Sequence, residues 1–149
     1  MPQESLSLKA EEELLRVGTN SPSVDKSSGQ ILRGAFLRRE PDEAGKKRDT
    51  HGLSVNLREK RTEQQTLNDW PRCHLIAVLT VRSVCAADPN LDVVQTDADR
   101  DFHANIVGLP ERGQDVPSEN YAKAERLATL LAKSSKPLYI KGTGFLKEI

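Results

Sequence analysis

Three histidines are the side chains of this sequence best suited to acid–base chemistry, because an imidazole exchanges its proton near neutral pH. His51 stands beside Gly52, three residues before Ser54, and His103 follows an acidic stretch. His74 opens the longest apolar run, where we expect it to cap the end of a strand. A single histidine more often has a structural or surface role. Catalysis is therefore considered for His51 and His103 only if the fold brings them together.

The acidic stretch before His103 raises the question of a metal site. Carboxylates from Asp97, Asp99 and Asp101, together with the imidazole, are ligands that divalent cations accept. The spacing lacks the glycine and the distal glutamate of an EF-hand loop, so no metal site is predicted. If this part of the chain forms a strand, Asp101, His103 and Asn105 share one face and lie beside one another.

Two cysteines, Cys73 and Cys85, flank the apolar run. At opposite ends of one strand they would be too far apart to bridge, because a disulfide needs Cα atoms within about 7 Å and a strand rises about 3.3 Å per residue. Both are expected to be free thiols in a reducing compartment. A nucleophilic role for Cys85 beside a histidine is the alternative to a small core residue, and the core role is preferred.

The common cofactor-binding and nucleophile motifs are missing from the sequence. It has no Gly-x-Gly-x-x-Gly, no Walker loop and no Gly-x-Ser-x-Gly, and no cofactor is expected. The 22 basic residues balance 22 acidic ones, which argues against a nonspecific nucleic-acid binder. Neither end carries an apolar segment long enough for a signal peptide or a membrane span, so we expect a soluble cytoplasmic protein with no membrane partner.

The elements that would position these residues are built around the apolar run 74–81. A short continuous apolar run bounded by polar residues predicts a strand buried on both faces. The β-branched residues Val78, Thr80 and Val81, and a proline shortly before the run, favour this strand over a buried helix. Residues 82–85 either extend the strand or bend away from it.

The remaining elements follow from periodicity and from turn residues. A short exposed helix is expected within 58–68, closed by Trp70-Pro71, and an amphipathic helix over 119–134, capped by Ser118. Further strands are predicted at 14–17, 53–57, 91–95, 102–108 and 138–140. Residues 21–30 are expected to form a loop, and 1–10 and 142–149 flexible tails. This order predicts a single α+β domain, with a small mixed or antiparallel sheet around 74–81 and the C-terminal helix packed on it.

The most charged part of the chain is residues 38–49. Such a run is usually a solvated loop, because it lacks the apolar side chains that would offset the cost of ordering it. The alternative is a loop that binds a partner or a phosphate group. Its basic residues, with one just before the run, are Arg33, Arg38, Arg39, Lys46, Lys47 and Arg48.

Two segments resemble a pattern found in small uncharacterised bacterial proteins. In the first, Gly34-Ala35-Phe36-Leu37-Arg38-Arg39 precedes, after a charged gap, Asp49 and the run Leu53-Ser54-Val55. In the second, His103-Ala104-Asn105-Ile106-Val107-Gly108 is similar to a histidine-containing strand of the same proteins. The resemblance covers about a third of the chain and implies no known activity.

A second resemblance is to ADP-ribosyltransferase-like toxins of the RES type, in which an early Leu-x-Arg-Val strand offers an arginine to NAD. Leu14-Leu15-Arg16-Val17 is similar to that strand, and a polar loop and the strand that bears Ser54 follow it. The later aromatic and glutamate pattern of that family has no counterpart here. The resemblance therefore implies a role for Arg16 and Ser54 alone.

Three functional hypotheses follow from the sequence. The first is an interaction module within a larger bacterial assembly, which contacts a protein partner through the charged loop 38–50. The second is a toxin-type enzyme that acts on NAD or a nucleotide, with Arg16, His51, Ser54 and His103 converging on one site. The third is nucleic-acid binding through the basic residues of 33–48, which predicts an affinity that falls steeply with salt.

Overall fold

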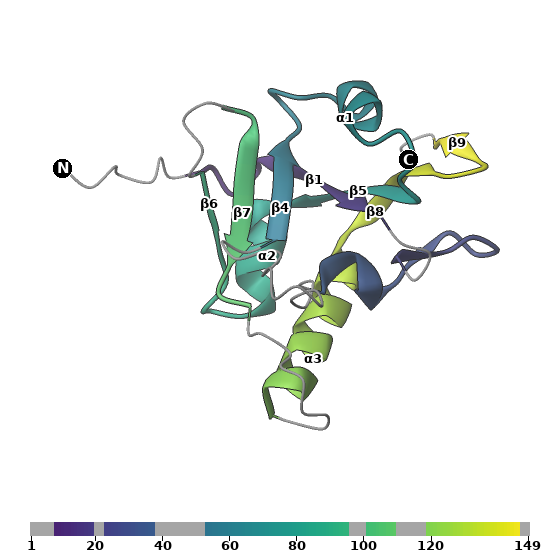
Figure 1. The fold of residues 1–149 in the computed structure, drawn as a ribbon. Coiled ribbons are helices and arrows are strands. Elements are labelled where there is room, and N and C mark those ends of the chain that lie inside the picture. Colours follow the sequence, from purple (N-terminus) through teal and green to yellow (C-terminus); the bar gives the residue numbers. More distant parts are fainter. Residues whose placement is uncertain (1–7, 20–22, 38–52, 96–100, 110–118, 147–149) are drawn as a thin grey trace, which may run out of the picture.

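The structure is a computed structural model that describes residues 8–19, 23–37, 53–95, 101–109 and 119–146. Its frame is a seven-stranded antiparallel sheet in the order β6-β7-β4-β1-β5-β8-β9 (Figure 1). The predicted α+β fold with a C-terminal helix is confirmed. The strands are β1 (Glu13–Gly18), β4 (Leu53–Leu57), β5 (Leu75–Thr80), β6 (Asp92–Val94), β7 (His103–Val107), β8 (Lys136–Ile140) and β9 (Gly144–Phe145).

The apolar run forms β5, an inner strand that pairs with β1 on one side and β8 on the other. Its side chains are buried on both faces of the sheet, as the continuous hydrophobic pattern predicts. The strand ends at Thr80, whose hydroxyl accepts a hydrogen bond from the Ser83 amide (3.2 Å) and caps α2 (Val81–Ala87). The chain therefore bends away after the strand. Cys85 lies exposed on this helix rather than at a strand end, and Cys73 is buried; both are free thiols.

The larger hydrophobic core lies between one face of the sheet and α3 (Glu119–Ser134), with α2 and the 3-10 helix η2 (Arg33–Phe36) beside it. Leu127, Ala128 and Leu131 of α3 are buried there, which confirms that the predicted C-terminal helix is amphipathic. Leu130 is 38% exposed because it lies off that face of the helix.

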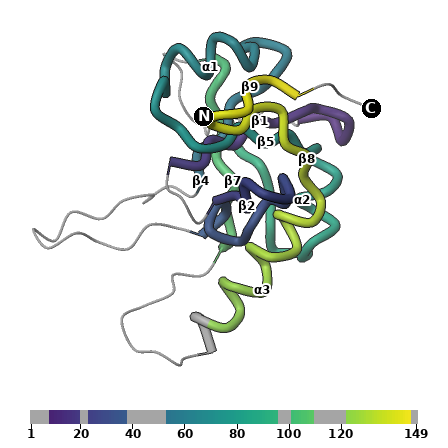
Figure 2. Tube along the Cα trace, turned by 90° about the vertical axis from the view of Figure 1, so that its right-hand side faces the viewer, coloured from purple at the N-terminus to yellow at the C-terminus, as the bar shows by residue number. Residues whose placement is uncertain are grey.

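A smaller core lies on the other face of the sheet, where Leu15, Ile76, Val78 and Leu138 pack with Cys73. The short helix α1 (Glu63–Asp69) contributes Leu67 to this cluster. Figures 1 and 2 accordingly show α1 above the sheet and α3 below it.

Two short pairings differ from the sequence-based expectation. The loop expected at 21–30 contains a hairpin of β2 (Val24–Asp25) and β3 (Gln30–Ile31), and the tail expected from Gly142 contains β9, which pairs with β8. At the other end, Leu8 packs against the larger core rather than being loose. β2, β3 and β9 have two residues each, too few to produce an alternating hydrophobic pattern. Within the described residues, no helix is long and apolar enough to cross a membrane.

Candidate functional site

The pairing between β1 and β4 is short. β1 pairs with β5 over six residues but with β4 over only two, Leu14↔Leu57 and Leu15↔Asn56. β4 continues instead along β7. Figure 1 shows the result: β4, β7 and β6 run together on one side, while β1, β5 and β8 turn away to the other.

Beyond Leu15, the main chain of β1 pairs with no described strand on the side of β4. Glu13 accepts a hydrogen bond from the Arg58 amide (3.0 Å), so its main-chain groups face β4. Because alternate residues of an antiparallel strand face the same neighbour, those of Val17 also point to the β4 side. Continuing the register would set Val17 opposite Ser54, but the pairing stops before it. A gap between the two strands begins here.

Arg16 bridges this gap with its guanidinium group. Nη1 donates a hydrogen bond to the Ser54 carbonyl (2.9 Å), and Nε donates one to the Ala35 carbonyl in η2 (2.7 Å). A side chain thus occupies the position of a strand partner, and it ties β1, β4 and η2 together. The planar fork of arginine suits two carbonyls in different directions, which a lysine ammonium on its flexible stem would not hold as well.

The gap is a cavity of about 130 Å³. It is lined by β1, β4, η2, the first residue of β7, and Trp70 at the end of α1. Apolar cavities of about 150 Å³ bind benzene, whereas sites for drug-sized ligands measure roughly 300–1,000 Å³. The enclosed space therefore has room for one ring or one phosphate-sized group, and the rest of a larger ligand would lie outside it.

Three of the four residues predicted as a catalytic group line this one cavity. Arg16 comes from β1, Ser54 from β4 and His103 from β7. His103 is half-buried and lies opposite Asn56 in the β4–β7 pairing. His51 lies outside the described residues. The strand order brings these three residues to one gap although they are far apart in the sequence. By the strand register, Ser54 and His103 share the face of the sheet that α1 covers, and Arg16 extends from the opposite face, where it contacts η2.

The acidic stretch contributes less to the cavity than its sequence suggests. Asp101 lies in the turn before β7, so it does not share the strand face of His103, and Asn105 is 4% exposed within the sheet. Asp97 and Asp99 lie outside the described residues. Within the described part of the chain, no three histidine, cysteine, aspartate or glutamate residues cluster as metal ligands would.

His74 has a structural position before β5 and is not among the residues that line this cavity. Its main-chain amide donates to Gly18 (2.8 Å), and its carbonyl accepts from Lys141 (3.0 Å). Burial, with smaller contributions from Lys141 and Lys26, lowers the pKa of the imidazole. Its role at a strand end agrees with the sequence-based expectation.

Of the basic residues predicted to bind a partner, only Arg33 lies within the described residues. It is exposed at the start of η2, and its Nε is 3.7 Å from a carboxylate oxygen of Glu125 in α3. Arg38, Arg39, Lys46, Lys47 and Arg48 lie outside the described residues, so the structure does not place the predicted contact loop.

Trp70 and Asn56 also line the cavity, and sequence reasoning missed both. The sequence signal at Trp70 was used only as a helix stop before proline. The indole is 48% exposed, one of the three large hydrophobic side chains that are exposed in the described part. Asn56 appeared only as the polar position of an alternating strand.

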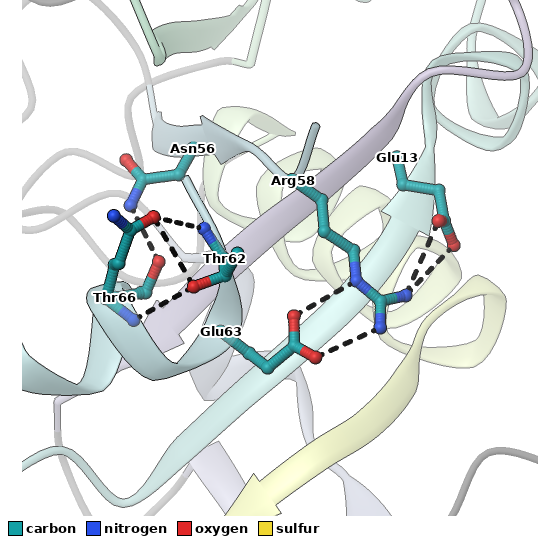
Figure 3. Close-up of polar contacts among 7 residues, drawn as sticks. Glu13, Asn56, Arg58, Thr62, Glu63 and Thr66 are labelled. Carbon is teal, nitrogen blue, oxygen red and sulfur yellow. Dashed lines mark hydrogen bonds and ion pairs between the residues drawn. The ribbon is translucent and has the colours of Figure 1, made fainter. Parts of the chain in front are cut away.

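The helix that ends at Trp70 is held to the sheet by the polar contacts drawn in Figure 3. Asn56 donates from Nδ2 to the hydroxyl of Thr66 (3.1 Å), a residue that is fully buried. Thr62 and Gln65 form a capping box at the start of the helix. The Asn56–Thr66 hydrogen bond attaches α1 to β4 and therefore helps to place Trp70 at the cavity.

Arg58 adds a second attachment. Its guanidinium is 3.2 Å from Glu63 at the start of α1 and 3.3 Å from Glu13 of β1. The arginine lowers the pKa of the Glu63 carboxyl, mainly through their hydrogen bonds.

Comparison with known proteins adds no relative to this description: no protein-family model, curated protein or solved structure matches the chain.

Proposed function

We propose that this protein binds NAD or a nucleotide in the cavity between β1 and β4 and acts on it as a toxin-type enzyme. The observation that carries the proposal is the convergence of Arg16, Ser54 and His103, from three strands, on one cavity. The same arginine and serine are the two residues that the resemblance to RES-type toxins implies.

Each of these side chains has a chemical role in the proposal. The cationic guanidinium of Arg16 favours an anionic ligand while it holds the edges of the cavity. The Ser54 hydroxyl is both a donor and an acceptor, and the His103 imidazole can accept or release a proton near neutral pH. A cation, a hydroxyl and an imidazole around a space for one ring suit a phosphorylated heterocycle.

The proposed reaction is transfer of the ADP-ribosyl group of NAD. The glycosidic C–N bond breaks, and nicotinamide leaves with the bonding electron pair. Water or a hydroxyl of a target bonds to the same ribose carbon and loses its proton, for which His103 is the proposed acceptor. General-base catalysis of this kind contributes about 10²- to 10⁴-fold to a rate.

The interaction-module and nucleic-acid hypotheses both rest on the basic residues of 33–50. Arg33 already pairs with Glu125, and the others lie outside the described residues. Both hypotheses therefore stay predictions. The catalytic hypothesis is preferred because the described cavity gives it a specific site.

The experiment is nicotinamide release from NAD by the purified protein, with NAD binding followed by calorimetry. We expect His103→Ala to lower the rate at least 100-fold and Ser54→Ala to weaken binding. His74→Ala is the matched control, since that histidine lies outside the cavity. Absence of NAD binding, or equal rates for the two histidine variants, would overturn the proposal.

A further inference from the structure

We infer that Trp70 is the stacking surface for the planar ring of the ligand, so that the cavity selects a heterocycle over a phosphorylated sugar alone. This inference rests on the proposed function and specifies which part of the ligand the cavity recognises. It concerns a residue that neither the histidine pattern nor either resemblance includes.

The exposure of Trp70 is the first observation. It is the only tryptophan of the chain, it is 48% exposed, and it lines the same cavity as Arg16 and His103. Aromatic contacts elsewhere in the described residues join Tyr139 to Phe145 and Arg61 to Phe102, and none involves the indole. A large apolar side chain beside a polar cavity thus keeps a face open to a ligand.

The hydrogen bonding of its main chain is the second observation. The Trp70 amide donates to the carbonyls of Thr66 (3.0 Å) and Leu67 (3.1 Å), and its own carbonyl accepts from Cys73 (3.0 Å). Pro71 follows directly and restricts the backbone further. A side chain whose backbone is already fixed loses less freedom when a ligand binds, which favours affinity.

The size and the polar lining of the cavity are the third observation. A space of about 130 Å³ accommodates one ring, and Asn56 and Ser54, which carry an amide and a hydroxyl, are among its lining residues. A heterocycle that carries ring nitrogens or an amide could stack on the indole and bond to these groups at its edge. A sugar phosphate could use the guanidinium of Arg16 but has no face to stack.

The test measures three probes on the intact protein: nicotinamide mononucleotide, AMP and ribose 5-phosphate. Since Trp70 is the only tryptophan, its fluorescence reports directly on stacking. We expect the two nucleotides to quench it and ribose 5-phosphate to leave it unchanged. Calorimetry should find that Trp70→Ala weakens nucleotide binding about 5- to 140-fold, the contribution usual for one stacked base.

Three variants separate stacking from other effects. Trp70→Phe keeps an aromatic face and should bind nucleotides within a few-fold of the parent, whereas Trp70→Leu keeps only the apolar bulk and should bind as weakly as Trp70→Ala. Phe145→Ala is the matched control, because Phe145 is 45% exposed but lies outside the cavity. Circular dichroism checks that each variant is folded. If Trp70→Ala does not fold, Trp70→Leu replaces it in the binding measurements.

The outcomes distinguish this inference from the proposed function. If the nucleotides bind but Trp70→Ala and Trp70→Leu bind them as tightly as the parent, the stacking role is wrong and the nucleotide site stands. If ribose 5-phosphate binds as tightly as nicotinamide mononucleotide, selection of a ring is also wrong. If none of the three probes binds the parent, the proposed function fails and this inference with it.

Discussion

Replacing Arg16 is the most direct test of how the gap between β1 and β4 is held together. Arg16→Ala removes two hydrogen bonds from a charged donor, one to the Ala35 carbonyl and one to the Ser54 carbonyl. Hydrogen bonds of this type contribute about 1.5–3 kcal/mol each. The bond to Ser54 is exposed and belongs at the lower end of that range, so the two together should contribute about 3 kcal/mol to the free energy of unfolding.

Arg16→Lys separates charge from geometry. A lysine ammonium reaches one of the two carbonyls but does not match both, so we expect a loss of about 1.5 kcal/mol. Since a domain of this size has a total stability of about 5–15 kcal/mol, both losses are large enough to measure.

Urea unfolding followed by circular dichroism is the assay. With a denaturant slope of about 2 kcal/mol/M, the midpoint should fall by roughly 1.5 M for Arg16→Ala and by roughly half as much for Arg16→Lys. Arg33→Ala is the control, because that exposed arginine makes only a surface ion pair with Glu125, and its loss should change stability by less than about 1 kcal/mol. If Arg16→Ala shifts the midpoint no more than Arg33→Ala does, the bridging role is wrong.

Two further predictions concern glycine geometry and pH. Gly108→Ala should cost about 3 kcal/mol, measured by urea unfolding, because the residue has φ +94° and a Cβ would lie 2.1 Å from the Asn90 carbonyl oxygen. Gly142→Ala, at φ +88° with open space around it, should cost only about 1 kcal/mol. Arg58 lowers the pKa of the Glu63 carboxyl in the folded state. The ion pair therefore stabilises the fold above the unfolded pKa near 4.5, and this stabilisation is lost as the pH falls through the lower folded pKa. Glu63→Gln should therefore flatten the acid side of a stability–pH curve.

For the glycine pair, equal losses in the two variants would show that contact with Asn90 is unimportant. For the carboxyl, parent and Glu63→Gln curves that stay parallel as the pH falls to 3 would contradict the ion pair. The expected difference between the curves at neutral pH is at most about 1 kcal/mol, because both partners are partly exposed.

Much of the fold follows from local patterns in the sequence. The continuous apolar run gives β5, the alternation of Leu53, Val55 and Leu57 gives β4, and the helical stripe gives most of the buried face of α3. The helix after β5 was not predicted. A weak signal was present, because threonine is a favoured N-cap residue and Thr80 caps this helix, but the β-branched residues around it outweighed that signal.

The candidate site could be predicted only in part. The residue types at Arg16, Ser54 and His103 suggested chemistry, but their convergence depends on the strand order β7-β4-β1, which no local pattern determines. Trp70 depends on the contact between Asn56 and Thr66, ten residues apart on a strand and a helix. Both features depend on contacts between separate elements, and a single sequence carries no direct signal for them.

The short contact between β1 and β4 also has a consequence for how the molecule opens. It divides the sheet into one block of β6, β7 and β4 and another of β1, β5, β8 and β9. The polar contacts described across this boundary include the two residue pairs, the Arg16 bond to Ser54, and the main-chain bond and ion pair between Arg58 and Glu13. Proteins open in cooperative units that follow such boundaries. Amide hydrogen exchange should therefore resolve two protection levels, and Arg16→Ala should widen the difference between them. Uniform protection across both blocks would mean that the sheet opens as one unit.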